Sequence, residues 1–562
     1  MRTPLLTVIM ITSLQALVGP NAHTLAAESV NMTFDLTATG KTITNKFSDI
    51  NVWSIGRMWT DESAGWPRDH FSGTFPFVRR VQLMAATGGN PRRDLFLDPN
   101  DRSTLTDYDF EPLIRACRNI LAMGLKPMIK TGWVPLKLSA QPKTSSFRTN
   151  VRPPEDYDAY YAYLKAVAEA LQGEFGVAEV RTWTWCVGVE YDNRDWFEAE
   201  DGQPETTRAA FFKLYDYSVA ALEDVLGPEH LTVGAHGMAP GGWGLWDMAD
   251  LLDHCAKGTN AKRAGRGTQL DFLTFSYYTK TPGFNPGKFV ADIDRLRSRA
   301  RQAGFHHLWF GVDEGRVLNG WDGKVIYGRE VQHPVQAAGD AKLFHLMVDR
   351  NVDYFSTWRL TTQGLRGGLP LASANLRNLT YRMTGSALVE ARPSGQPTHD
   401  GNDVGGLAGY DAATQTLRVL LYNFNPDRDA AGSEDVSLTL TGVRTGHGGA
   451  LTLRRWLLDE DHGNWWKAWQ ADVAARKMTA ESFKHSQWTV ALPGDLADPA
   501  DVTFWRSRVA DYAEAARLTP VDQSFSLDPH GGVRWRTRLR ANAVVLYELS
   551  PVEPAPSTQP SQ

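Results

Sequence analysis

Hydrophobic positions follow a repeating pattern through the first two thirds of the chain. Between about residues 47 and 360, short apolar runs typical of strands alternate with longer amphipathic stretches. The strand-like runs are Ser48 to Trp53, Phe77 to Met84, Lys126 to Gly132, Val180 to Val189, Leu231 to His236, Phe272 to Tyr278, Leu308 to Val312 and Tyr354 to Trp358. The helix-like stretches include Tyr108 to Met123, Tyr157 to Leu171, Thr207 to Leu226, Phe289 to Ala303 and Ala337 to Val348. This alternation predicts an α/β fold, a (β/α)8 barrel whose active site lies at the carboxyl ends of the strands.

The pattern changes after about Gly368, where strand-like runs follow one another without helices. These runs are Val404 to Tyr410, Thr416 to Phe424, Val436 to Thr441, Leu451 to Leu458 and Ala543 to Leu549. They predict a C-terminal β-sandwich accessory domain, interrupted by a Trp-rich insertion at about residues 461–510. We expect an N-terminal strand within residues 28–45 to join this sandwich. The barrel then spans 46–367 and the sandwich 368–550, and the Pro/Ser/Gln-rich tail at 551–562 is expected to be disordered.

The first 27 residues have the composition of a signal peptide. Arg2 precedes an apolar run from Leu5 to Val18, and small residues follow at Ala26 and Ala27. The run is short for a membrane span, so we expect a secreted or periplasmic protein with no membrane attachment after cleavage. An uncleaved anchor is the alternative.

The composition of the chain limits the classes of molecule that the protein is expected to bind. The formal net charge of −5 and the interspersed signs argue against nucleic acid, which requires a concentrated basic surface. The 19 Trp residues favour carbohydrate, because aromatic faces stack on sugar rings, although most Trp residues pack in cores. Cys117, Cys186 and Cys255 lack metal-ligand spacing, and an odd count cannot be fully paired, so we interpret them as buried thiols. No metal or other cofactor is expected, and a homo-oligomer stays open.

Two glutamates stand where a barrel places its catalytic groups. Glu190 follows the fourth strand-like run and Glu314 the seventh, on opposite sides of the predicted barrel mouth. This placement suits glycoside hydrolysis, in which one carboxyl protonates the leaving oxygen and the other attacks the anomeric carbon. Either residue alone could be a solvated loop carboxylate. Asp313 is a rival nucleophile, but neighbours on a strand point in different directions, and we favour Glu314.

Several motifs resemble glycoside hydrolase family 39. Gly188-Val189-Glu190-Tyr191 is similar to the family's acid/base segment, and the run from Asp271 to Tyr278 to its sixth strand. In the sandwich, His462-Gly-Asn464, Trp469 and the run from Ala543 to Leu549 resemble further family segments. The resemblance implies a retaining O-glycoside hydrolase with Glu190 as acid/base and Glu314 as nucleophile. It also implies that Tyr278 contacts the nucleophile.

Two positions depart from the family pattern. Val189 replaces an Asn that ordinarily binds the sugar's 2-hydroxyl, and Ser276 replaces a His. We therefore expect an arabinofuranosyl or other non-xylose glycone, on a plant or microbial polysaccharide. Exo action on terminal units is favoured, while an endo-acting hydrolase and an inactive carbohydrate-binding protein are the alternatives.

Other residues at strand ends are candidate substrate contacts. They are Arg80, Trp133, His236, Tyr278, Trp321 and Trp358. For Arg80 and for Lys130, an ion pair inside the barrel is an equal alternative, and His236 could be a structural histidine. The absence of a Gly-x-Ser-x-Gly elbow and of a His-Glu-x-x-His helix weakens esterase and metalloprotease hypotheses.

Overall fold

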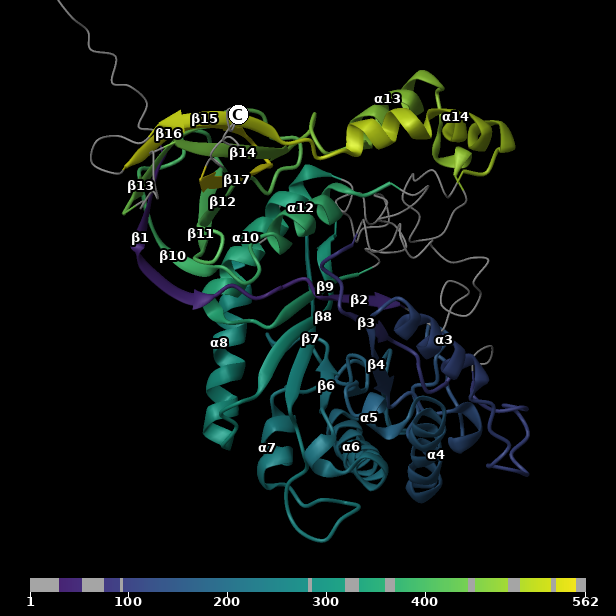
Figure 1. The fold of residues 1–562 in the computed structure, drawn as a ribbon. Helices are drawn as coiled ribbons and strands as arrows, with labels where there is room; N and C mark the ends of the chain where they lie inside the picture. The colour runs from purple at the N-terminus through teal and green to yellow at the C-terminus, as the bar shows by residue number, and fades with distance from the viewer. Residues whose placement is uncertain are drawn as a thin grey trace, which may run out of the picture.

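The computed structural model describes residues 30–52, 75–90, 94–280, 286–318, 333–358, 369–442, 450–483, 496–526 and 532–551. These residues form two sheets, one of eight strands and one of nine. Figure 1 shows the eight-stranded sheet in the lower part of the molecule, surrounded by helices, and the nine-stranded sheet above it. Among the described residues, no helix combines the length and the apolar character needed to cross a bilayer.

The eight-stranded sheet is a parallel barrel in which the strands follow one another in chain order. Its strands are β2 (Asp49–Val52), β3 (Arg80–Leu83), β4 (Lys126–Thr131), β5 (Thr184–Val187), β6 (Val233–Gly237), β7 (Phe272–Lys280), β8 (Trp309–Leu318) and β9 (Tyr354–Thr357). The covering helices are α3 (Glu111–Ala122), α4 (Tyr157–Phe175), α5 (Val177–Val180), α6 (Pro204–Leu226), α7 (Asp250–Lys257), α8 (Pro286–Ala303), α10 (Pro334–Arg350) and α12 (Ala372–Tyr381). The predicted (β/α)8 barrel is therefore confirmed.

The nine-stranded sheet forms the accessory domain. Its strands are β1 (Val30–Thr42), β10 (Ala387–Ser394), β11 (Asp403–Asp411), β12 (Thr416–Phe424), β13 (Ser433–Thr441), β14 (Ala450–Leu458), β15 (Val521–Ser526), β16 (Val533–Arg540) and β17 (Ala543–Pro551). β1 lies between β10, to which it is antiparallel, and β13, to which it is parallel. Alternate residues of β13 are buried, such as Val436, Leu438 and Leu440, so one face of this strand packs on the core.

The Trp-rich insertion forms two helices, α13 (Trp466–Ala475) and α14 (Pro499–Ala516), which Figure 1 shows beside the nine-stranded sheet. Their aromatic side chains pack on one another: Trp505 stacks on Tyr512 with ring centroids 4.5 Å apart, and Trp469 meets Trp505 edge-on at 5.2 Å. Trp465 and Trp469 are fully buried. Several of the many Trp residues thus stabilise a core and do not face sugar.

The start of helix α4 follows directly from the local sequence. Asp156 caps α4, because its side chain accepts hydrogen bonds from the backbone N–H groups of Asp158 and Ala159. The predicted run from Val180 begins too early, since α5 continues to Val180 and β5 starts at Thr184. The predicted signal peptide at residues 1–27 and residues 552–562 of the predicted tail lie outside the described residues.

Candidate active site

The barrel interior is filled in layers, and β7 contributes a side chain to each. Phe272 packs at the bottom with Met128 and Tyr354, and Thr274 lies in the middle, where it donates to Asp313. Ser276 and Tyr278 follow at alternate positions toward the carboxyl end of the strand. The barrel mouth is therefore lined by side chains two and four positions beyond the middle layer.

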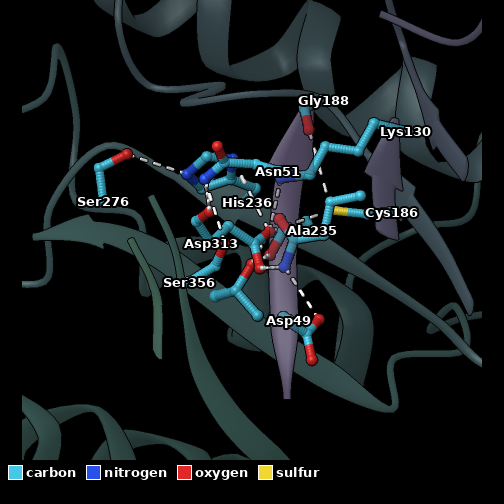
Figure 2. A network of polar contacts seen from close by, with 12 residues as sticks. Asp49, Asn51, Lys130, Cys186, Gly188, Ala235, His236, Ser276, Asp313 and Ser356 are labelled. Carbon is cyan, nitrogen blue, oxygen red and sulfur yellow. Dashed lines mark hydrogen bonds and ion pairs between the residues drawn. The ribbon is translucent and has the colours of Figure 1, made fainter. Parts of the chain in front are cut away.

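The middle layer is a hydrogen-bonded network centred on Asp313, drawn in Figure 2. Lys130 Nζ lies 2.6 Å from Asp313 Oδ2, and both side chains are fully buried. The same carboxylate accepts from the Thr274 hydroxyl at 2.7 Å, the Gln82 amide at 3.1 Å and the Tyr354 hydroxyl. Burial opposes ionisation of Asp313, but the Lys130 charge and these donors outweigh it and hold its pKa far below the ordinary value. Asp313 is thus a saturated structural carboxylate and cannot act as the nucleophile.

A β-bulge separates Asp313 from Glu314. Val312 pairs with Phe275 and Glu314 pairs with Ser276, so Asp313 is an extra residue on β8. The bulge lets two consecutive acidic side chains occupy successive layers of the barrel, which simple strand alternation would not allow. β8 also continues to Leu318, so Glu314 lies within the strand. The sequence pattern had placed it after the end of the strand.

Glu190 lies in a strained turn directly after β5. Its backbone φ is +43°, in the left-handed region that non-glycine residues rarely adopt. Close backbone packing surrounds the turn, since a Cβ on Gly132 would lie 2.8 Å from the Gly188 nitrogen. Asn193 Nδ2 and Trp196 Nε1 each donate to Glu190 Oε2 at 2.8 Å. The strained backbone and the two donors fix this carboxyl at the mouth.

The carboxyl groups of Glu190 and Glu314 share a hydrogen bond, and the Tyr278 hydroxyl also hydrogen-bonds to Glu314. Glu314 Oε2 has no hydrogen-bond partner among the described residues although it is buried. Burial, followed by the neighbouring Glu190, raises the pKa of Glu314 well above its ordinary value. Burial and the nearby Glu190 thus favour the neutral form of Glu314 in the empty site, because an ionised carboxylate is costly where it is buried beside a second carboxyl group.

A mainly aromatic cluster, called here the aromatic wall, meets Glu190 through Trp196. It is a cluster of Met84, Ala85, Trp133, Val189, Trp196 and Trp358, with Phe147 and Tyr278 packed against it. Trp196 stacks on Phe147 with centroids 4.4 Å apart and lies 5.4 Å from Trp133. Trp133, Val189 and Trp358 come from segments directly after β4, β5 and β9. The structure therefore brings Trp133, Trp358 and Tyr278 to the mouth beside Glu190.

Two predicted substrate contacts lie elsewhere. Arg80 is the first residue of β3, at the end of the barrel opposite the mouth, where its Nε lies 2.7 Å from Asp49 Oδ2. Its guanidinium also lies over the Trp309 and Tyr354 rings. This position and these partners favour the second of the two alternatives that the sequence left open for Arg80, an ion pair inside the barrel.

His236 is fully buried in β6, between Lys130 Nζ at 2.8 Å and Ser276 Oγ at 3.0 Å. Burial and the Lys130 charge lower its pKa well below the ordinary value, so the ring is neutral. It belongs to the network beneath the mouth and does not face the site itself. Trp321 lies outside the described residues.

Three residues of the site were not identified from the sequence pattern. Asn193 and Trp196 hold Glu190 from positions three and six residues later, a spacing that a turn after the strand could have suggested. Arg316 lies two residues beyond Glu314 on β8 and is 2% exposed, and its charge acts on Tyr278. Its location became evident only when β8 was seen to continue past Glu314.

The thiols of Cys117, Cys186 and Cys255 are free and buried, as predicted. Within the described ranges, no group of three or more His, Cys, Asp or Glu side chains is arranged to hold a metal ion.

A barrel with two glutamate carboxyls in contact at its mouth and an aromatic wall beside them defines an O-glycoside hydrolase. The comparisons with known proteins agree with this class. The model of glycosyl hydrolases family 39 matches residues 98–300. A beta-xylosidase of Geobacillus stearothermophilus is 22% identical over 417 residues, which cover 69% of this chain and 74% of the relative.

Solved structures show the same fold over nearly the whole chain. The GH39 enzyme from Xanthomonas axonopodis pv. citri gives a TM-score of 0.66 at 16% identity and covers 96% of this chain and 100% of that chain. A monomeric beta-xylosidase from Caulobacter crescentus CB15 gives 0.65 at 17% identity, covering 93% and 100%. The family 39 model thus matches the central part of the barrel, and the solved structures share the fold of the chain.

Proposed function

We propose that this protein is a retaining glycosidase in which Glu190 is the general acid/base and Glu314 the nucleophile. The observation that supports it is the contact between the two carboxyl groups at the barrel mouth. Retaining enzymes hold their carboxyls about 5–5.5 Å apart, whereas inverting enzymes leave about 6.5–9.5 Å for a water molecule. A pair in contact fits the shorter spacing.

The surroundings of each carboxyl support its role. Glu314 Oε2 is buried and lacks a partner among the described residues, so it is open to attack an anomeric carbon. One oxygen of Glu190 is held by Asn193 and Trp196, which leaves the other to protonate the leaving oxygen. The retaining mechanism requires that, with substrate bound, Glu314 carries the negative charge and Glu190 carries the proton.

For the glycone, we propose an arabinofuranosyl or other non-xylose sugar. Val189, in the position where the family has Asn, is 2% exposed and packs in the aromatic wall, so this position offers no donor to a 2-hydroxyl. The curated relatives carry the name beta-xylosidase, which makes a xyloside the competing candidate. We further propose exo action on terminal units and export through the N-terminal segment.

A panel of 4-nitrophenyl pyranosides and furanosides tests the function and the glycone together. We expect at least one substrate to release 4-nitrophenol. The first sugar product should keep the anomeric configuration of the substrate. The value of kcat/KM should be higher on the arabinofuranoside than on the β-xyloside. An inverted first product would contradict the retaining mechanism, and preference for the β-xyloside would contradict the glycone proposal. Single sugars released from a reduced oligosaccharide would support exo action, and N-terminal sequencing of the exported protein tests cleavage near residue 27.

A further inference from the structure

Ser276 takes part in a chain of buried hydrogen bonds. The positive charge of Lys130 decides which atom donates and which accepts in each of them. Lys130 Nζ lies 2.6 Å from Asp313 Oδ2 and 2.8 Å from His236 Nδ1, and His236 Nε2 lies 3.0 Å from Ser276 Oγ. Figure 2 shows these groups from Ser276 through His236 to Asp313. The chain therefore connects the saturated carboxylate of the middle layer to a hydroxyl in the mouth layer.

The contact between Lys130 and His236 determines the donor and the acceptor at each step of the chain. An ammonium has only donors, so the ring nitrogen that faces Lys130 must accept. A neutral imidazole has one acceptor and one N–H, and the nitrogen that faces Ser276 therefore donates. This order holds whichever ring nitrogen faces the ammonium, and the low pKa of His236 agrees with a neutral ring. Ser276 Oγ consequently accepts from His236, and its own proton remains available for donation.

The direction of that proton is set by the fold. Ser276 pairs with Glu314 across the β7–β8 bulge, one step above Thr274, which donates to Asp313 in the layer below. Within the described residues, no hydrogen bond takes up the Ser276 proton. The neighbouring Glu314 Oε2 likewise has no partner there. The hydroxyl is thus an oriented donor beside the nucleophile, in the layer that faces the substrate.

We propose that Ser276 donates a hydrogen bond to one hydroxyl oxygen of the glycone, and that Lys130 and His236 are positioning residues that set this donor direction. The proposal rests on the proposed function and deepens it, because it names a contact that selects the sugar. A donor of this kind recognises a ring hydroxyl of the sugar whose anomeric carbon faces Glu314. A deoxy sugar that lacks this hydroxyl leaves the serine proton unpaired and binds the transition state less well.

The test compares Ser276→Ala with the unaltered enzyme on the preferred 4-nitrophenyl glycoside of the panel and on its monodeoxy analogues. We expect the substitution to lower kcat/KM about tenfold on the parent glycoside, as a single lost neutral hydrogen bond implies. On one of the deoxy analogues the same substitution should change kcat/KM by less than twofold. Ser356→Ala, a matched change one layer below on β9, should leave the ratio between parent and deoxy substrates unaltered.

Two substitutions at His236 test the positioning. His236→Gln can accept from Lys130 through its carbonyl and donate to Ser276 through its amide, so it should keep the discrimination between parent and deoxy glycosides. His236→Leu can do neither, and the discrimination should fall to the level of Ser276→Ala. Equal loss with both His236 variants, or a Ser276→Ala penalty that persists on every deoxy analogue, would overturn the inference. An enzyme that hydrolyses no glycoside of the panel would instead overturn the proposed function.

Discussion

Two adjacent layers of the barrel interior differ in how completely their polar groups are hydrogen-bonded. In the middle layer, Asp313 accepts from Lys130, Thr274, Gln82 and Tyr354 and keeps its charge. In the mouth layer, Glu314 has a buried oxygen without a partner among the described residues and a raised pKa. Asp313 and Glu314 are consecutive in sequence. The surroundings of each carboxyl group, and not its residue type, therefore decide whether it is structural or reactive.

The largest effect is expected at the nucleophile. Glu314→Gln should lower kcat on every glycoside by at least about 10⁴-fold, because no covalent intermediate can form. A raised pKa means that the ionised form costs the folded state stability, and this cost grows as pH rises. The neutral amide avoids it, so the melting temperature at neutral pH should rise. Steady-state kinetics and calorimetry check both. A variant with full activity would remove Glu314 from the mechanism.

The acid/base should show a strong dependence on the leaving group. Glu190→Ala is expected to lower turnover of unactivated glycosides by about 10³–10⁴-fold but to spare 2,4-dinitrophenyl glycosides much more, since a good leaving group needs little protonation. Azide should partly restore activity and yield a glycosyl azide, detectable by mass spectrometry. Equal losses on activated and unactivated substrates would assign the role to another residue.

Substitutions in the middle layer should lower the stability of the folded protein. Lys130→Met leaves the Asp313 charge buried without its ion pair, and we expect a loss of about 3–5 kcal/mol in the free energy of unfolding. Lys126→Met is the matched control on the same strand, because Lys126 pairs with Glu179 at a partly exposed site. Its loss should be about 1 kcal/mol or less. Similar denaturation midpoints for the two variants would show that the layer does not stabilise the barrel.

The pH profile of kcat/KM should report the coupled pair. The nucleophile must be ionised, so a raised pKa of Glu314 shifts the acid limb to higher pH than an ordinary glutamate would give, and activity falls as pH drops through that value. Glu190→Gln removes the like charge next to Glu314. On a dinitrophenyl glycoside, the acid limb of this variant should therefore move to lower pH. An unmoved limb would show that the two groups titrate independently.

The smallest effect is expected at Val189. An Asn there would place an amide within the aromatic wall, and we expect Val189→Asn to leave kcat/KM on the preferred glycoside unimproved, with a change of less than tenfold, about 1.4 kcal/mol. Kinetics on the arabinofuranoside and the β-xyloside measure it. A tenfold gain on the preferred sugar would show that Val189 does not determine specificity.

The sequence by itself determined the barrel, most strand positions and the two glutamates. Apolar runs in alternation with amphipathic stretches are local features, and they define βα units whose ends must lie together at the mouth. Only the tertiary structure decided the position of each polar group within the barrel. Arg80 and His236 have the residue types of sugar ligands, but strand register places Arg80 at the far end and His236 beneath the mouth.

The bulge on β8 was likewise invisible in the sequence. Its extra residue depends on hydrogen bonding to β7, and it places Asp313 and Glu314 in successive layers. Asn193 and Trp196 became partners of Glu190 only because the turn after β5 folds back on that carboxyl. Residue types and their spacing along the chain thus define the candidates. Contacts between strands that are distant in sequence decide which of them can react.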